Sequence, residues 1–190
     1  MNAALVPAVR PTIYFIGVTT GQSSIMKVFP RWAEALNLGD CEIRGMDFPL
    51  HADPASYRRA VEFIAADPMS LGALVTTHKL DLYSACKDMF ATIDPHARFM
   101  EEISSLSKAD GGLVCHAKDP ISSGLALDSF LPERHFAKTG AELLCIGAGG
   151  SAIAIIHHLT QVSRGADIPT RIVVTNRSQP RLDHIRSPHR

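Results

Sequence analysis

A glycine-rich turn that begins at residue 147 is the clearest candidate for chemistry in this sequence. Residues 143–152 read Leu-Leu-Cys-Ile-Gly-Ala-Gly-Gly-Ser-Ala and join an apolar run to a helical one. Gly147 permits a tight turn, Gly149 lets the backbone approach a pyrophosphate, and Ala152 allows the helix to pack closely on the strand. A helix N-terminus also offers free N–H groups and a positive dipole end to phosphates. The turn therefore predicts a nucleotide site built from Gly147, Ala148, Gly149, Gly150 and Ser151.

The residues that follow the next apolar run indicate which dinucleotide to expect. NAD-binding domains commonly place a carboxylate there, which accepts hydrogen bonds from the ribose. This sequence instead has Asn176, Arg177 and Ser178, with Arg181 just beyond. Guanidinium groups without an acid suit the 2′-phosphate of NADP, which is the predicted cofactor. The alternative is that Arg177 and Arg181 are solvated residues at the start of a helix.

Three further polar clusters follow expected strands or turns, where α/β proteins place functional groups. Residues 19–24 carry hydroxyls suited to a polyol or carboxylate, although local sequence favours Ser23 or Ser24 as a helix N-cap. Residues 76–79 end in Lys79, which is either a proton-transfer group or a solvated charge. Residues 118–119 supply Asp119, which with Pro120 is also a common helix start.

The segments that would position these clusters alternate between strand and helix patterns. We expect strands at 12–18, 41–46 and 71–76, helices at 25–36, 54–66 and 80–89, and a hairpin from 104–109 and 113–117. This alternation predicts an α/β fold with largely parallel strand pairing. An N-terminal α/β substrate-binding domain is expected at residues 1–120, a connecting helix at 121–138, and the start of a Rossmann-type NAD(P)-binding domain at 139–190. This last domain is expected to be incomplete, as a fragment or a natural truncation, because a doubly wound domain needs further strands.

Composition excludes several classes of protein. The 190 residues are 46% hydrophobic and 20% charged, which is typical of a globular protein. Nineteen basic residues balance nineteen acidic ones, so no nucleic-acid partner is expected. Neither a membrane span of roughly 20 apolar residues nor a secretory leader is found, which predicts a cytoplasmic location without a membrane partner. The cysteines and histidines lack metal-ligand spacing, so no metal is expected and the cysteines are predicted to be free thiols.

The order of these features resembles the shikimate and quinate dehydrogenase family along nearly the whole chain. Residues 17–23 resemble its serine-containing loop, G-x-P-I-x-H-S-x-S-P, and Val75, Thr76 and Lys79 resemble its N-V-T-x-P-x-K signature. Residues 117–119 lie where the family has N-T-D. Residues 147–150 and 176–181 closely resemble its G-A-G-G and N-R-T-x-x-R motifs.

This resemblance implies reversible oxidation of a ring hydroxyl to a ketone on a small cyclic hydroxy acid, with hydride passing to NADP. It also implies a place in the shikimate pathway of aromatic amino acid biosynthesis, and it leaves a homodimer open. On matching positions, Lys79 would transfer the proton and Asp119 would orient the substrate hydroxyl. Ser23 and Thr76 would hold the substrate's hydroxyls or carboxylate.

Several positions depart from the family pattern, and they concern the substrate. Ile25 replaces the second serine of the loop, Ser104 stands at an asparagine, and Ala117 replaces the asparagine of N-T-D. The lysine signature is about one residue shorter, with Leu74 at its asparagine and no proline. An altered substrate is therefore expected. Two alternatives remain: a non-catalytic regulator that binds a cyclic acid or NADP on the same scaffold, and a folate-type dehydrogenase, which these motifs fit less well.

Overall fold

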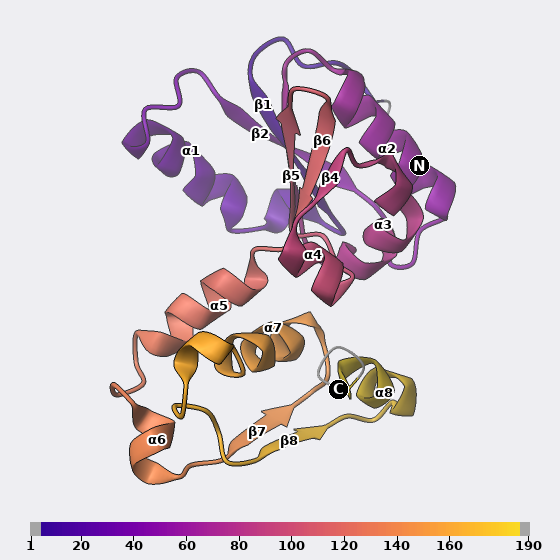
Figure 1. Ribbon diagram of the computed structural model, residues 1–190. Helices are drawn as coiled ribbons and strands as arrows, with labels where there is room; N and C mark the ends of the chain where they lie inside the picture. The colour runs from indigo at the N-terminus through magenta and orange to yellow at the C-terminus, as the bar shows by residue number, and fades with distance from the viewer. Residues whose placement is uncertain (1–4, 187–190) are drawn as a thin grey trace. The chain divides into compact units, whose positions relative to one another are not determined.

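The computed structural model describes residues 5–186, and the chain divides into two compact units, residues 1–117 and 118–190. The first unit is built on a six-stranded sheet and the second on a two-stranded sheet (Figure 1). Across residues 5–186, no helix is both long and apolar enough to cross a membrane. The same residues contain no disulfide, and Cys86 and Cys115 are buried, which raises the pKa of each thiol to about 12.

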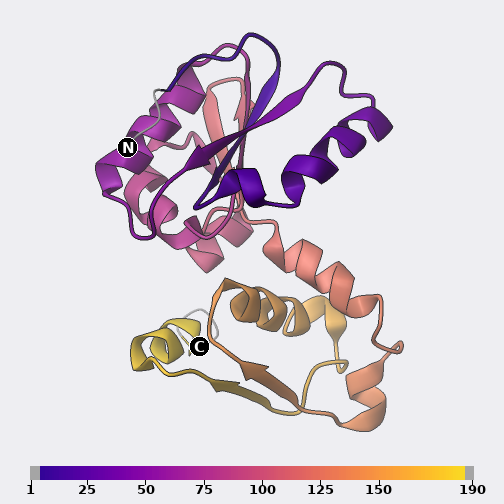
Figure 2. The ribbon, with the colours of Figure 1, turned by 180° about the vertical axis from the view of Figure 1, so that it is seen from behind.

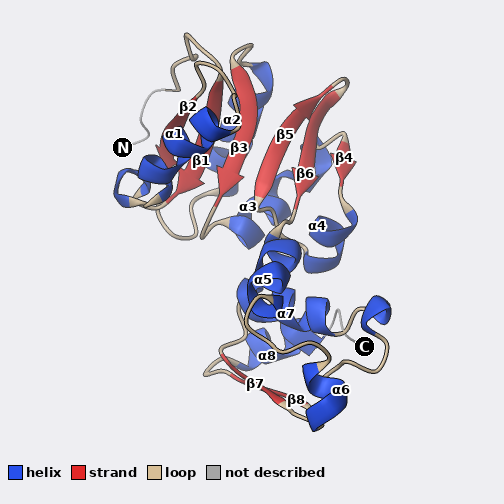
Figure 3. Cartoon of the chain, turned by 90° about the vertical axis from the view of Figure 1, so that its left-hand side faces the viewer, coloured by secondary structure: helices blue, strands red, loops and turns tan. Residues whose placement is uncertain are grey.

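The sheet of the first unit has the strand order β2-β1-β3-β5-β6-β4, which Figure 3 displays from one edge to the other. β1 runs parallel to both β2 and β3, β5 is antiparallel to β3 and β6, and β4 is parallel to β6. The strands are β1 (Thr12–Gly17), β2 (Glu42–Asp47), β3 (Ser70–Val75), β4 (Thr92–Ile93), β5 (Ser105–Ala109) and β6 (Gly112–His116). The helical segments are η1 (Thr20–Gln22), α1 (Ile25–Ala35), α2 (Pro54–Ala66), α3 (Lys79–Cys86), η2 (Lys87–Met89) and α4 (Pro95–Met100).

Helices cover this sheet from both sides. α1 lies on one side, and α2 and α3 lie on the other (Figures 1 and 2). The apolar residues of α2 recur at helical spacing, so that Tyr57, Ala60, Val61 and Ile64 are all buried. α2 packs on β3, and its Phe63 ring meets Tyr14 of β1 edge to face.

The predicted α/β fold class is confirmed, and the predicted elements of the first unit end within a few residues of the observed ones. β4 and α4 were not predicted. β4 has two residues, too few to show a strand period, and α4 has six. The available signal was Asp94-Pro95, the same start pattern as Asp53-Pro54 at α2: the Asp94 side chain accepts a hydrogen bond from the Ala97 N–H at 2.7 Å.

The second unit contains α5 (Asp119–Asp128), α6 (His135–Thr139), β7 (Leu143–Ile146), α7 (Gly150–Leu159), η3 (Val162–Arg164), β8 (Ile172–Thr175) and α8 (Gln179–Arg186). β7 and β8 are parallel, and α5 packs on α7. A Cβ on Gly124 of α5 would overlap the His158 ring, which bonds Asp128 at 2.8 Å. The single helix expected at 121–138 is therefore incorrect: residues 129–134 separate two helices, and α5 packs inside the second unit.

A buried carboxylate fastens the start of the first unit. Asp67, which is 3% exposed, accepts hydrogen bonds from Tyr14 Oη at 2.5 Å and from the N–H groups of Ala8 and Met69 at 3.1 and 3.0 Å. Its backbone carbonyl accepts a further bond from Lys108 Nζ at 2.8 Å. Burial alone would raise the pKa of Asp67, but these donors outweigh it and the pKa lies below its usual value.

We expect Asp67→Asn to destabilise the chain by about 1.5–3 kcal/mol at pH 7, since the charged acceptor of several buried donors is lost. A carboxyl whose pKa is lower in the folded than in the unfolded state stabilises the fold at pH values above its unfolded-state pKa. That stabilisation is lost as the pH falls through its folded-state pKa. The gap between wild type and variant should therefore shrink below about pH 4. Urea unfolding at pH 7 and pH 3 measures it. Asp110→Asn, in an exposed turn, is the control and should change little; a gap independent of pH would contradict the assignment.

Candidate active site

The ends of β1 and β3 bring two predicted substrate residues together. Because these strands are parallel, their carboxyl ends lie at one edge of the sheet, and the Thr76 N–H donates to the Ile16 carbonyl at 3.0 Å. The loops that follow enclose a cavity of about 340 Å³. Its lining residues are Phe15, Gly17, Val18, Thr19, Thr20, Gln22, Ser23, Thr76 and Thr77. Hydroxyl groups from Ser23 and Thr76 therefore border the same cavity.

Thr20 holds the first of these loops against the edge strand β2. Its N–H and Oγ1 both donate to Asp47 Oδ1, at 2.8 and 2.5 Å. A Cβ on Gly45 would overlap the Thr20 hydroxyl, so glycine is required at that position. Ser24 occupies the N-cap of α1, but its side chain makes no capping bond within the described chain, and Ser23 precedes it. The N-cap interpretation of the Ser23 hydroxyl is therefore not supported.

The second loop contains a strained residue. Thr77 has a φ of +60°, which a β-branched side chain rarely adopts. The His78 N–H donates to the Thr76 carbonyl at 2.5 Å, so Thr77 lies at the centre of a hydrogen-bonded turn of the γ type. α3 then begins directly at Lys79. This tight turn is how the chain connects β3 to α3 with a lysine signature shortened by one residue.

Two backbone bonds fix Lys79 and Ser104 at the same edge of the sheet. The Lys79 carbonyl accepts from the Ile103 N–H at 3.2 Å, and the Ser104 carbonyl accepts from the Val75 N–H at 2.9 Å. His78, which the sequence did not single out, is 1% exposed and bonds the Tyr57 hydroxyl through Nδ1 at 2.8 Å. Its side chain is buried at the end of the turn and links α2 to the start of α3.

A chain of side-chain hydrogen bonds positions the end of β6. Asp94 Oδ2 lies 3.2 Å from His116 Nδ1, and His116 Nε2 lies 2.9 Å from Ser107 Oγ. Asp94 Oδ1 also accepts from the Ala117 N–H at 3.5 Å. Ala117 is fully buried and does not line the polar cavity. Because the three partners come from the N-cap of α4, from β5 and from β6, single-sequence patterns gave no indication of this network.

In the second unit, the glycine turn lies beside the segment that follows β8. Ile146 pairs with Thr175 in the parallel sheet, and the Gly147 N–H donates to the Thr175 carbonyl at 2.8 Å. Gly147 has a φ of +116°, a conformation that requires glycine. Asn176 Oδ1 accepts from the Ser178 N–H at 3.0 Å, which forms a compact turn at the same edge.

Gly149 tests whether a dinucleotide fits this turn. Its φ is −95°, which any residue can adopt, and an added Cβ would meet no other described atom within 4 Å. Neither backbone conformation nor packing among the described residues explains a glycine here. A ligand that approaches the backbone does explain it, and α7 begins at Gly150 with its N-terminal N–H groups facing the turn. Residues 147–151 therefore suit a pyrophosphate.

The remaining predicted residues are exposed or lie at helix starts. Arg177 and Arg181 are exposed, the first after β8 and the second within α8. Asp119 is the first residue of α5 and belongs to the second unit, whereas Lys79 is the first residue of α3 and belongs to the first. Their pairing remains a prediction.

Solved structures show the same fold. The chain aligns with shikimate dehydrogenase from Aquifex aeolicus at a TM-score of 0.71 and 18% identity, covering 96% of this chain and 62% of that one. The Listeria monocytogenes enzyme in complex with shikimate and NAD aligns at a TM-score of 0.68 and 17% identity, covering 96% of this chain and 58% of that one. The Thermus thermophilus enzyme in complex with NADP(H) and shikimate aligns at a TM-score of 0.65 and 19% identity, covering 93% of this chain and 60% of that one.

These alignments confirm, at the level of the fold, the resemblance to shikimate dehydrogenases. The chain spans less than two thirds of each of those three structures. No family model matches the sequence, and a search of curated proteins finds no match.

We expect Thr77→Gly to stabilise the protein by about 1 kcal/mol. Relief of a β-branched residue in the left-handed region yields on the order of 1–3 kcal/mol, from which the entropy cost of glycine, about 0.5–1 kcal/mol, is subtracted. Urea unfolding measures the difference. Thr19→Gly is the matched control: Thr19 is exposed with a φ of −138°, so glycine there should destabilise by about 0.5–1 kcal/mol. Equal destabilisation by both variants would show that Thr77 is not strained.

Proposed function

We propose that this protein is an NADP-dependent oxidoreductase that interconverts a ring hydroxyl and a ketone on a small cyclic hydroxy acid. The observation that carries the proposal is the glycine turn hydrogen-bonded to the end of β8, with Gly149 open to a ligand and arginines following the same edge. The polar cavity at the ends of β1 and β3 supports a hydroxylated substrate. The solved Thermus thermophilus structure with NADP(H) and shikimate has the same fold, which supports this choice of ligands.

The cofactor residues are assigned on the arrangement of the second unit. Residues 147–151 would hold the pyrophosphate through backbone N–H groups and the N-terminus of α7. Arg177 and Arg181, together with Asn176 and Ser178, would surround the 2′-phosphate. The first ionisable residue after β8 is Arg177, and residues 172–176 contain no acid. When bound, the nicotinamide supplies a hydride acceptor for the alcohol.

The substrate would lie in the polar cavity of the first unit. Ser23 and Thr76 would donate hydrogen bonds to its hydroxyls or carboxylate, since both line the cavity. Three positions offer fewer polar contacts to a substrate than the family pattern does: Ile25 is apolar, Ser104 is short, and Ala117 is buried. A substrate with fewer hydroxyls than shikimate fits this arrangement better, because each unpaired buried hydroxyl costs binding energy.

Proton transfer is assigned to Lys79, with Asp119 as its partner. The hydroxyl proton must leave the alcohol as the hydride leaves, and an amine beside the developing alkoxide both takes the proton and stabilises the charge. The position of Lys79, immediately after the strained turn at Thr77, supports this role because the turn fixes the start of α3. The non-catalytic regulator is not favoured by any feature of residues 5–186.

We expect the chain to bind NADP more tightly than NAD through Arg177 and Arg181. Arg177→Ala and Arg181→Ala should each weaken NADP binding about tenfold and leave NAD binding nearly unchanged, because the guanidinium groups contact only the 2′-phosphate. Calorimetric titration with both cofactors provides the measurement. Arg171→Ala, an exposed arginine paired with Glu142 at the other end of β8, is the control. Equal affinity for the two cofactors in wild type would refute the NADP assignment.

We expect NADP-dependent oxidation to be slow with shikimate and faster with analogues that lack a ring hydroxyl. Three missing hydrogen bonds at about 1 kcal/mol each correspond to a loss of roughly a hundredfold in kcat/KM. The measurement is NADP reduction, followed by absorbance, with shikimate, quinate and deoxygenated analogues.

Lys79→Ala should abolish this turnover while cofactor affinity stays unchanged. Lys87→Ala, a lysine of the following η2 segment, is its control and should retain activity. An efficiency with shikimate near 10⁴ M⁻¹s⁻¹ or above would overturn the substrate assignment. Full activity of Lys79→Ala would overturn the proton-transfer role.

A further inference from the structure

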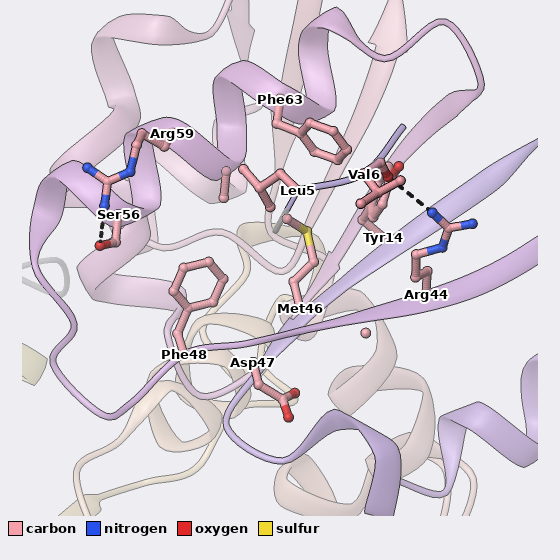
Figure 4. Close-up of a pocket in the computed structure, with 12 residues that line it drawn as sticks. Leu5, Val6, Tyr14, Arg44, Met46, Asp47, Phe48, Ser56, Arg59 and Phe63 are labelled. Carbon is pink, nitrogen blue, oxygen red and sulfur yellow. Dashed lines mark hydrogen bonds between the residues drawn. The ribbon is translucent and has the colours of Figure 1, made fainter. Parts of the chain in front are cut away.

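The first unit has a second cavity on a different part of its surface. It measures about 380 Å³, within the range of small-molecule sites, and lies between α2 and the edge strand β2 (Figure 4). Met46, Phe48 and Phe63 contribute its apolar surface, and Leu5 lies over them. Met46 and Phe48 are each 8% exposed and form the floor of the cavity, whereas Phe63 is half-buried and Leu5 is exposed, so these two leave more apolar surface for a ligand.

This cavity is separate from the polar cavity described above. The two share no lining residue. Met46 and Asp47 are neighbours on β2, where successive side chains point to opposite faces. Figure 4 shows Met46 directed toward Phe63 and Leu5, and Asp47 directed away from them. Asp47 also borders the cavity, but its Oδ1 accepts two hydrogen bonds from Thr20 on the side away from Phe63 and Leu5 (Figure 4).

Two arginines border the cavity, and their partners differ. Arg44 is committed: it donates to the Val6 carbonyl at 3.2 Å and forms an ion pair with Glu42 at 2.7 Å. Arg59 bonds only the Ser56 hydroxyl, at 2.9 Å, and has no ion-pair partner among residues 5–186. An exposed guanidinium beside an apolar surface has donors available for a carboxylate, which it can bind with two parallel hydrogen bonds.

We propose that this cavity binds a small apolar carboxylate, with the carboxylate on Arg59 and the apolar body against Met46, Phe48 and Phe63. The aromatic rings offer edges and faces for a second ring, which favours an aryl-substituted acid. The hydroxy acid inferred above would leave its ring hydroxyl unpaired on this surface. The site is therefore distinct in chemistry as well as in position.

The test uses 3-phenylpropionate and its neutral analogue 3-phenylpropanamide as probes, titrated into the ¹⁵N-labelled chain and followed by NMR. The acid should bind saturably and shift the amides of residues 46, 48 and 63, with the amide analogue at least tenfold weaker. Arg59→Gln should weaken binding of the acid at least tenfold. Arg31→Gln, an exposed arginine on α1 outside this cavity, should bind like wild type.

Circular dichroism of both variants checks that they fold, which is expected because both arginines are exposed. Three outcomes would overturn the proposal. They are no saturable binding up to about 10 mM, near the weak limit of specific sites; equal affinity of wild type and Arg59→Gln; and shifts confined to residues 17–23 and 76–77, which would assign the acid to the polar cavity instead. None of these readouts depends on turnover, so they leave the proposed enzymatic function to its own tests.

Discussion

Parallel strand pairing is the constraint on which both candidate sites depend. In the first unit, the hydrogen bond from the Thr76 N–H to the Ile16 carbonyl sets the ends of β1 and β3 side by side. In the second, the bond from the Gly147 N–H to the Thr175 carbonyl does the same for β7 and β8. Loops that leave neighbouring parallel strands at one edge must meet, so distant segments supply hydroxyls to one cavity and backbone donors to one turn.

Close backbone approach and strain both occur at these loops. Gly45 leaves room for the Thr20 hydroxyl to reach Asp47, and Gly147 adopts a conformation closed to other residues. Thr77 adopts a positive φ without being glycine. Strained residues persist where the surrounding structure fixes them. Here His78, which directly follows Thr77, is buried and bonded to Tyr57. Packing of His78 therefore fixes the backbone between Thr77 and Lys79.

The two cavities of the first unit differ in polarity and share no lining residue. Hydroxyls of the loops after β1 and β3 dominate one, whereas Met46, Phe48 and Phe63 form the other. Alternation along β2 contributes, because Met46 points toward Phe63 and Leu5, whereas Asp47 points away from them and bonds Thr20, which lines the polar cavity (Figure 4). Asp47 Oδ1 accepts both bonds from Thr20, whereas Arg59 of α2 bonds Ser56 and keeps further donors unused. The two cavities of the first unit therefore differ in charge and polarity.

The sequence by itself determined the α/β class, the glycine turn, most helices and strands of the first unit, and the residues that resemble a dehydrogenase. These features are local: hydrophobic period, Asp-Pro helix starts and glycine spacing lie within a short window. Only the tertiary structure decided the strand order, the short β4 and α4, the packing of α5 on α7 and the network from Asp94 through His116 to Ser107. It alone also revealed the cavity between α2 and β2. β4 and α4 are too short to show a period, and the other features depend on contacts between segments far apart in the chain, which the pattern of one sequence does not encode.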